Sequence, residues 1–171
     1  MSKPTIDVKG LCHFVIIVND IHKAAAEWGR LLGLKESELN LRVRGNNQAE
    51  NVVPDPRNHY RGDHNFGNGK EYEWIEADIQ MGGWMIELIQ PGEKGPFREY
   101  YEKHGTGIHH IAFRVGDKCD EINDMLEADG YDYIVDCYSP NNDRWPVHDT
   151  EDILGTNLCI KPGLEQLTEI H

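Results

Sequence analysis

The sequence predicts an α+β protein built from two copies of one structural unit. Residues 11–18 (LCHFVIIV) and 108–115 (IHHIAFRV) both have the short, apolar, β-branched character of buried strands. Each is followed by a stretch with helical apolar spacing that ends at a glycine, and then by further strands. The two first strands begin at residues 11 and 108, which are 97 residues apart, so we infer an internal duplication.

The first unit contains a helix, two further strands and an insertion. Asn19 and Asp20 are candidate N-caps, and Gly33 is the candidate C-cap, of a helix with an apolar face formed by Ile21, Ala24, Ala25, Trp28, Leu31 and Leu32. Strands over 71–81 and 84–90 are separated by two glycines, which is a hairpin turn signal. The polar stretch between these strands and the helix predicts a long loop over residues 37–70.

The second unit repeats this layout after a short linker helix. Pro96 suits the start of the linker helix and Gly105 its end. A helix over 119–130 follows the strand at 108–115. Three strands come after this helix, over 131–138, 144–150 and 156–162. We therefore place the first module, with its insertion and the linker helix, at residues 1–106 and the second at 107–171.

Composition favours a globular protein of the cytoplasm. Of the 171 residues, 39% are hydrophobic and 27% are charged, and no apolar run is long enough to cross a bilayer. The net charge of −13 disfavours a nucleic-acid partner, because phosphate binding needs a basic patch. No secretion signal is apparent. Reduced thiols are expected, because no CxxC pair occurs among Cys12, Cys119, Cys137 and Cys159.

Two histidines occupy equivalent places in the duplicated first strands. His13 superposes on His110 when LCHFVIIV is laid over IHHIAFRV. Because alternate residues of a strand share a face, the two imidazoles can converge across a pseudo-two-fold axis. The same alternation places His109 on the opposite face, as a packing residue or as a support for the site. A lone strand histidine is more often a hydrogen-bonded core residue, so the case depends on further ligands.

The last strand of each unit offers such ligands. Glu87 is the only charge between Met85 and Gln90, and a buried carboxylate costs several kcal/mol unless it is paired or binds a cation. Cys159 superposes on Glu87 in the second unit. Its thiol is either a fourth ligand or a small buried residue. Glu87 alone would suit a solvent-facing position, but together with the two histidines it favours a metal site.

The residue types suit a divalent first-row metal. Zinc, iron, manganese, cobalt and nickel all accept imidazole and carboxylate ligands. His13, His110 and Glu87 would leave open positions, as catalytic sites do. The same three residues form the two-histidine, one-carboxylate set of non-haem Fe(II) oxygenases. Cys159 as a fourth ligand would favour a softer metal, such as zinc.

The combined motifs resemble the vicinal oxygen chelate superfamily, which includes glyoxalase I, methylmalonyl-CoA epimerase, extradiol dioxygenases and antibiotic-resistance proteins. The resemblance rests on LCHFVIIV with its following helix, on IEL at the end of the first half and on GTGIHHIAFRV, and it covers about residues 8–36 and 71–162. The linker PGEKGPFREYYEKHGTG is most similar to the epimerase-like branch. The resemblance implies paired βαβββ modules that form a cup-shaped mixed sheet around a divalent metal, and a homodimer.

The resemblance also implies functional residues. The family's ligands fall on His13, Glu87 and His110, and the position of its usual fourth ligand, a glutamate, is Cys159 here. The base of the epimerases falls near Glu71, with Glu73 and Glu76 close by; Glu71 also suits an exposed strand end.

These residues imply a metal-dependent lyase or isomerase that acts on a small substrate with vicinal oxygens through an enolate-type intermediate. Two alternatives stay open: an Fe(II) dioxygenase, and a non-enzymatic ligand-binding or resistance protein. The insertion is expected to reach over the cup, where arginines are either solvated or meet an anionic substrate; they are Arg42, Arg44, Arg57 and Arg61.

Overall fold

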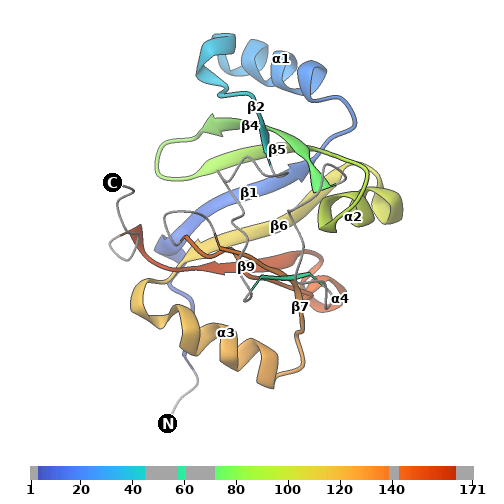
Figure 1. Ribbon diagram of the computed structural model, residues 1–171. Coiled ribbons are helices and arrows are strands. Elements are labelled where there is room, and N and C mark those ends of the chain that lie inside the picture. The colour runs from blue at the N-terminus through green and yellow to red at the C-terminus, as the bar shows by residue number, and fades with distance from the viewer. Residues whose placement is uncertain (1–3, 45–57, 61–71, 139–142, 165–171) are drawn as a thin grey trace.

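Within the described residues, the strands form one nine-stranded mixed sheet (Figure 1). The computed structural model describes residues 4–44, 58–60, 72–138 and 143–164. The first unit comprises β1 (Leu11–Ile17), α1 (Ile21–Leu32), β2 (Arg42–Arg44), β4 (Trp74–Gln80) and β5 (Met85–Pro91). The second comprises β6 (Gly107–Arg114), α3 (Cys119–Ala128), β7 (Tyr133–Asp136), β8 (Val147–His148) and β9 (Asn157–Lys161). The other elements are α2 (Pro96–His104), β3 (His59–Tyr60), α4 (Glu151–Leu154) and the 3-10 helices η1 (Val8–Gly10), η2 (Glu36–Glu38) and η4 (Gly116–Lys118).

The strand order shows the duplication directly. It runs β2-β4-β5-β1-β6-β9-β8-β7-β3, with β1 parallel to β5 and β6 parallel to β9. The two units meet where β1 runs antiparallel to β6. The α+β fold with two βαβββ modules in one cup-shaped mixed sheet is thereby confirmed. The boundary between residues 106 and 107 stays a prediction.

The described strands of the insertion lie at the two edges of the sheet. β2 pairs antiparallel with β4 at one edge, in the first unit. β3 pairs antiparallel with β7 at the other edge, in the second unit. The stretch 37–70, expected to be mostly loop, therefore contributes two short strands and contacts both units before the chain returns to β4.

The predicted helix caps of α1 are present. The Asp20 side chain accepts a hydrogen bond from the Lys23 backbone N–H at 3.0 Å, and Gly33 ends the helix in the left-handed region at φ 69°. The apolar face was placed partly wrongly, because Leu31 and Leu32 are 63% and 40% exposed. The residues after α1 fold back so closely that a side chain at position 29 would contact them. The buried residues of the helix are therefore Ile21, Ala25 and Gly29.

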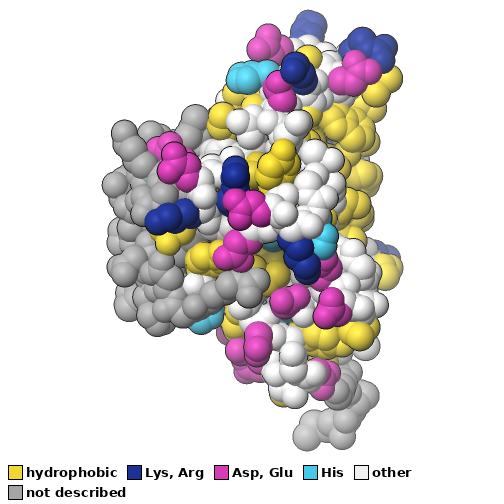
Figure 2. Space-filling model, turned by 90° about the vertical axis from the view of Figure 1, so that its right-hand side faces the viewer, with side chains coloured by type: hydrophobic (Ala, Val, Ile, Leu, Met, Phe, Trp, Pro, Cys, Tyr) yellow, Lys and Arg dark blue, Asp and Glu magenta, His cyan; other side chains and the backbone are white. Residues whose placement is uncertain are grey.

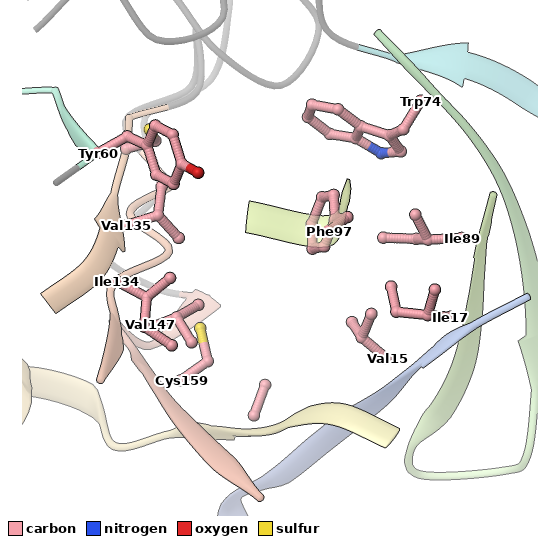
Figure 3. Close-up of a cluster of buried hydrophobic side chains, with 12 residues drawn as sticks. Val15, Ile17, Tyr60, Trp74, Ile89, Phe97, Ile134, Val135, Val147 and Cys159 are labelled. Atoms are coloured by element: carbon pink, nitrogen blue, oxygen red, sulfur yellow. The ribbon is translucent and has the colours of Figure 1, made fainter. Parts of the chain in front are cut away.

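Three apolar clusters hold the layers together. The inner cluster lies inside the cup, where residues of the two units face one another with Phe97 of α2 between them (Figure 3). A second cluster joins α1 to the outer face of β4 and β5, and a third joins α3 to β9. In Figure 1 these two helices lie at opposite ends of the molecule. The inner face of the sheet is therefore the surface shared by both units.

Surface charge, helix length and cysteine pairing can be stated for the described residues. On the face in Figure 2, acidic and basic side chains are interspersed rather than gathered into a basic patch. None of the described helices has the length and apolar content needed to cross a membrane. All four cysteines are free thiols.

Gly10, which precedes β1, tests the close approach of β1 to β6. A Cβ at this position would lie 2.3 Å from the backbone oxygen of Arg114, so Gly10→Ala forces the backbone to move. We expect a loss of about 1–3 kcal/mol in the free energy of unfolding, measured by urea denaturation. Gly83→Ala is the matched control, because nothing lies within 4 Å of a Cβ there. Equal stability of the two variants would contradict this packing.

Candidate metal centre

The register of the sheet makes Glu87 and Cys159 equivalent. In the first unit Val15 of β1 pairs with Glu87, and in the second unit Ala112 of β6 pairs with Cys159. Val15 and Ala112 each lie two residues after the histidine of their strand. The equivalence read from the duplicated sequence therefore holds in the strand pairing.

Three of the four candidate ligands border one cavity inside the cup. Its volume is about 190 Å³, and its lining includes His13, Glu87 and His110. The Nε2 atom of His13 lies 3.9 Å from Oε2 of Glu87, and the ring centroids of His13 and His110 are 5.6 Å apart. Two ligands of one ion stand about 3–3.4 Å apart when each bond is about 2.0–2.1 Å, so small inward movements would suffice between His13 and Glu87.

Cys159 has different surroundings. It is fully buried in the inner apolar cluster, where it lies beside Val147 and Ile134 (Figure 3). Burial raises the pKa of its thiol strongly, which disfavours the thiolate that a metal would need. It does not belong to the described lining of the cavity. Its role as a ligand stays a prediction.

A bulge places His109 beside His110 instead of on the opposite face. Val15 pairs with His110 and Ile16 with Ile108, so His109 is skipped in the ladder between β1 and β6. The Nδ1 atoms of the two histidines lie 2.8 Å apart, in hydrogen-bonding contact. Strict alternation along the strand was therefore the wrong basis for placing His109, because an extra residue breaks the two-residue period.

The ring contacts select which nitrogen of each histidine remains available. The His109 ring also bonds the Pro96 carbonyl, and we expect it to donate there through Nε2, which makes its Nδ1 the acceptor toward His110. His110 then carries its proton on Nδ1 and keeps the lone pair on Nε2. Nδ1 of His13 contacts the Cys12 thiol at 3.4 Å, which leaves Nε2 on the side of Glu87. Both imidazoles thus present Nε2, in the manner of a supported metal ligand.

Electrostatics keep these rings neutral. Burial, assisted by the positive charges of Lys161 and Arg114, lowers the pKa of His13 to about 3. Burial and the neighbouring histidines hold the pKa of His110 well below its usual value. Metal ions bind the neutral imidazole, so no proton has to leave these ligands near pH 7.

Glu87 also belongs to an acidic group with Glu76 and Asp78. Among the described residues, these three side chains form the set of potential ligands whose oxygens lie within 4.8 Å of one another. Burial and the two neighbouring carboxylates raise the pKa of Glu87 well above its usual value. Arg42 forms ion pairs with both neighbours, and Trp74 donates to Glu76, so Glu76 is already engaged through both oxygens.

The donor set fits a divalent cation. Oδ1 of Asp78 is buried without a hydrogen-bond partner in the described structure, and Glu87 is a buried carboxylate that neighbouring negative charges destabilise. A cation beside Glu87 would stabilise its charged form, and Asp78 belongs to the same acidic group. His13 and His110 add neutral nitrogen donors, which favour zinc, iron, manganese, cobalt or nickel over calcium or magnesium.

A second charged group borders this cavity, and the sequence patterns did not indicate it. Lys161 of β9 lies with Nζ 2.8 Å from Oδ2 of Asp143, and Arg114 of β6 bonds the same carboxylate. The available signal was the alternation along β9, which places Lys161 on the same face as Cys159. Glu71, the proposed base, lies outside the described residues.

The comparisons with known proteins identify relatives by family and by fold. A family model for the glyoxalase/bleomycin resistance protein/dioxygenase superfamily matches residues 12–147. No curated protein matches the chain. A Streptomyces coelicolor methylmalonyl-CoA epimerase variant, solved in complex with 2-nitronate-propionyl-CoA, has a TM-score of 0.60 at 14% identity over 94% of this chain and 99% of its own.

Two other solved structures agree with this fold. Methylmalonyl-CoA epimerase from Mycobacterium tuberculosis has a TM-score of 0.55 at 20% identity, covering 96% of this chain and 95% of its own. A hypothetical protein from Bacillus halodurans C-125 has a TM-score of 0.58 at 20% identity, covering 93% and 97%. At these identities the likeness supports the fold alone.

The tautomer of His110 can be observed directly. In metal-free protein at pH 7 we expect His110 to be neutral with its proton on Nδ1, because Nδ1 of His109 accepts from it. Two-bond ¹H–¹⁵N spectra of the imidazoles distinguish the tautomers. His109→Phe preserves an aromatic ring but removes the acceptor, and it should shift His110 toward a tautomer mixture. An Nε2–H form of His110 in the unaltered protein would contradict this assignment.

Proposed function

Because the chain belongs to the glyoxalase/bleomycin resistance protein/dioxygenase superfamily, we propose that it is a metal-dependent lyase or isomerase. The proposed substrate is a small molecule with two neighbouring oxygens. The observation that supports this most is that both duplicated histidines and Glu87 line one cavity. The epimerase names of the structural neighbours favour an isomerase. The cytoplasmic location and the homodimer stay predictions.

We assign the metal to His13, His110 and Glu87. A divalent ion, when bound there, supplies a Lewis acid for the neighbouring oxygens of the substrate. His109 orients His110 through the contact between their Nδ1 atoms. Trp74, Phe97 and Trp145 form apolar walls of the same cavity, and these limit the access of water to the reacting carbon.

A carboxylate is needed to move the α-proton of the substrate. Glu76 suits this role poorly, because Arg42 and Trp74 already bind its oxygens. We therefore retain Glu71 as the proposed base, which takes the proton from the α-carbon. Protonation of the α-carbon on its opposite face, which needs a second proton donor, gives epimerisation. Return of the proton from Glu71 at a different atom gives isomerisation.

One observation favours a second candidate, an Fe(II) dioxygenase. A cysteine, Cys159, and not a carboxylate occupies the position equivalent to Glu87, so the candidate ligands are two histidines and one carboxylate, the ligand set of non-haem iron oxygenases. Metal analysis and oxygen uptake separate the two reactions. Activity that persists without oxygen, with any bound divalent metal, supports the isomerase or lyase.

Metal content tests the assigned ligands. Protein purified without chelator should contain close to one divalent ion per chain by elemental analysis, and His13→Ala or His110→Ala should lower this at least tenfold. His104→Ala is the matched control, because His104 lies on α2 and pairs with Glu151 at 2.6 Å, away from the cavity lining. Full metal content in both ligand variants would contradict the assignment.

Exchange of the α-proton with deuterium tests the proposed base. Glu71→Gln should lower the exchange rate of an active substrate by about 10²-fold or more while metal content stays unchanged. Glu73→Gln is the matched control and should change the rate only a few-fold. The converse pattern would move the role of base to Glu73, and unchanged exchange in both variants would remove the base from this segment.

A further inference from the structure

The basic residues of the cavity fall into two groups with different surroundings. Arg42 is held between Glu76 and Asp78, so two carboxylates face one guanidinium. Arg114 and Lys161 instead share one carboxylate, that of Asp143. The first group therefore carries an excess of negative charge, and the second an excess of positive charge.

We propose that Lys161, supported by Arg114, binds the carboxylate of an anionic substrate inside the candidate metal cavity. The substrate class is a small carboxylic acid with a carbonyl group on the neighbouring carbon. This proposal rests on the proposed function for the placement of the carbonyl oxygen. The anion subsite itself is formed by residues of the chain and does not require the metal.

The geometry leaves Lys161 available for a ligand. Its side chain is 9% exposed and lines the cavity, and within the described structure Asp143 is its one carboxylate partner. Arg114 is more fully engaged, because it donates to both oxygens of Asp143 and to the Pro162 carbonyl at 3.0 Å. An ammonium has three N–H donors, so Lys161 can bind Asp143 and a second anion together.

The duplication shows that the fold does not require charges at this place. Arg114 pairs with Lys161 between β6 and β9, and the equivalent pair between β1 and β5 is Ile17 with Ile89. Both isoleucines are fully buried. The same pair of strand positions is thus filled by apolar packing in the first unit. Burying two cations around one carboxylate is costly, so a bound anion accounts for them better than structural stability does.

The charge of the lining, taken together with a bound divalent ion, favours an anionic ligand. Three carboxylates and three basic side chains border the cavity: Glu76, Glu87 and Asp143 against Arg42, Arg114 and Lys161. A divalent ion held by His13, His110 and Glu87 would add two positive charges. A carboxylate placed between that ion and Lys161 offsets them in a site of low dielectric constant. The cavity of about 190 Å³ suits a small acid.

Oxamate and oxamide are matched probes for this subsite. Both carry two neighbouring oxygens, and they differ by one negative charge. In calorimetric titrations, Lys161→Gln should weaken oxamate binding about tenfold or more and leave oxamide binding within about twofold. Lys161→Arg should retain most of the affinity for oxamate. Lys103→Gln is the control, because Lys103 is exposed on α2 and pairs with Glu151 outside the cavity lining.

Wild-type protein supplies a second measurement, which does not depend on the folding of a variant. In metal-free protein, oxamate should shift the NMR signals of the Lys161 ε-methylene group, and oxamide should not. An equal loss of affinity for oxamate and oxamide in Lys161→Gln would overturn the subsite. An unperturbed Lys161 signal at saturating oxamate would also overturn it.

Metal content is measured in the same samples, which separates this proposal from the proposed function. Lys161-dependent oxamate binding by protein that cannot take up a metal would contradict the metal-dependent function alone. Metal-loaded protein whose oxamate affinity is independent of Lys161 would contradict the subsite alone.

Discussion

The antiparallel pairing of β1 with β6 is the constraint on which the candidate site depends. Among the described strands, it joins the two units at the centre of the sheet, and it carries both histidines. Neither unit alone could bring two imidazoles together from equivalent positions. The inner apolar cluster and Phe97 close the cup behind this junction, so the packing that unites the two units also buries His13 and His110. Stability and site geometry therefore share the same contacts.

Burial has opposite effects on the two kinds of ligand. It lowers the pKa of the imidazoles, which keeps them neutral and ready to bind a cation. It raises the pKa of Glu87, and the nearby Glu76 and Asp78 raise it further, so the charged form of this carboxylate depends on a compensating positive charge. Arg42 compensates its two neighbours through direct ion pairs. The proposed cation between Glu87 and the imidazoles would satisfy both kinds of candidate ligand.

Much of the fold, and the gathering of three candidate ligands around one cavity, could be predicted from the sequence, because both follow from local patterns. Alternation and β-branched residues located the strands, and repetition located His13, His110 and Glu87 together. The features that the sequence patterns misplaced or did not indicate depend on longer-range contacts. His109 lies on another face than expected because a bulge against β1 interrupts the two-residue period. This bulge cannot be recognised in the sequence of β6. Lys161 was overlooked because its partner Asp143 comes from a separate segment, and only the folded sheet brings Arg114 beside them.

The two duplicated units carry different charges at equivalent strand positions. This difference indicates how a substrate would be oriented. The first unit supplies Glu87 where the second supplies the uncharged Cys159, and it supplies Ile89 where the second supplies Lys161. Acidic side chains therefore gather on the side of β4 and β5, and basic side chains on the side of β6 and β9. A cation and an anion bound in the same cavity would be drawn to opposite sides of it. A small acid would then enter with one defined end toward β9, which fixes the α-carbon relative to any base that approaches it.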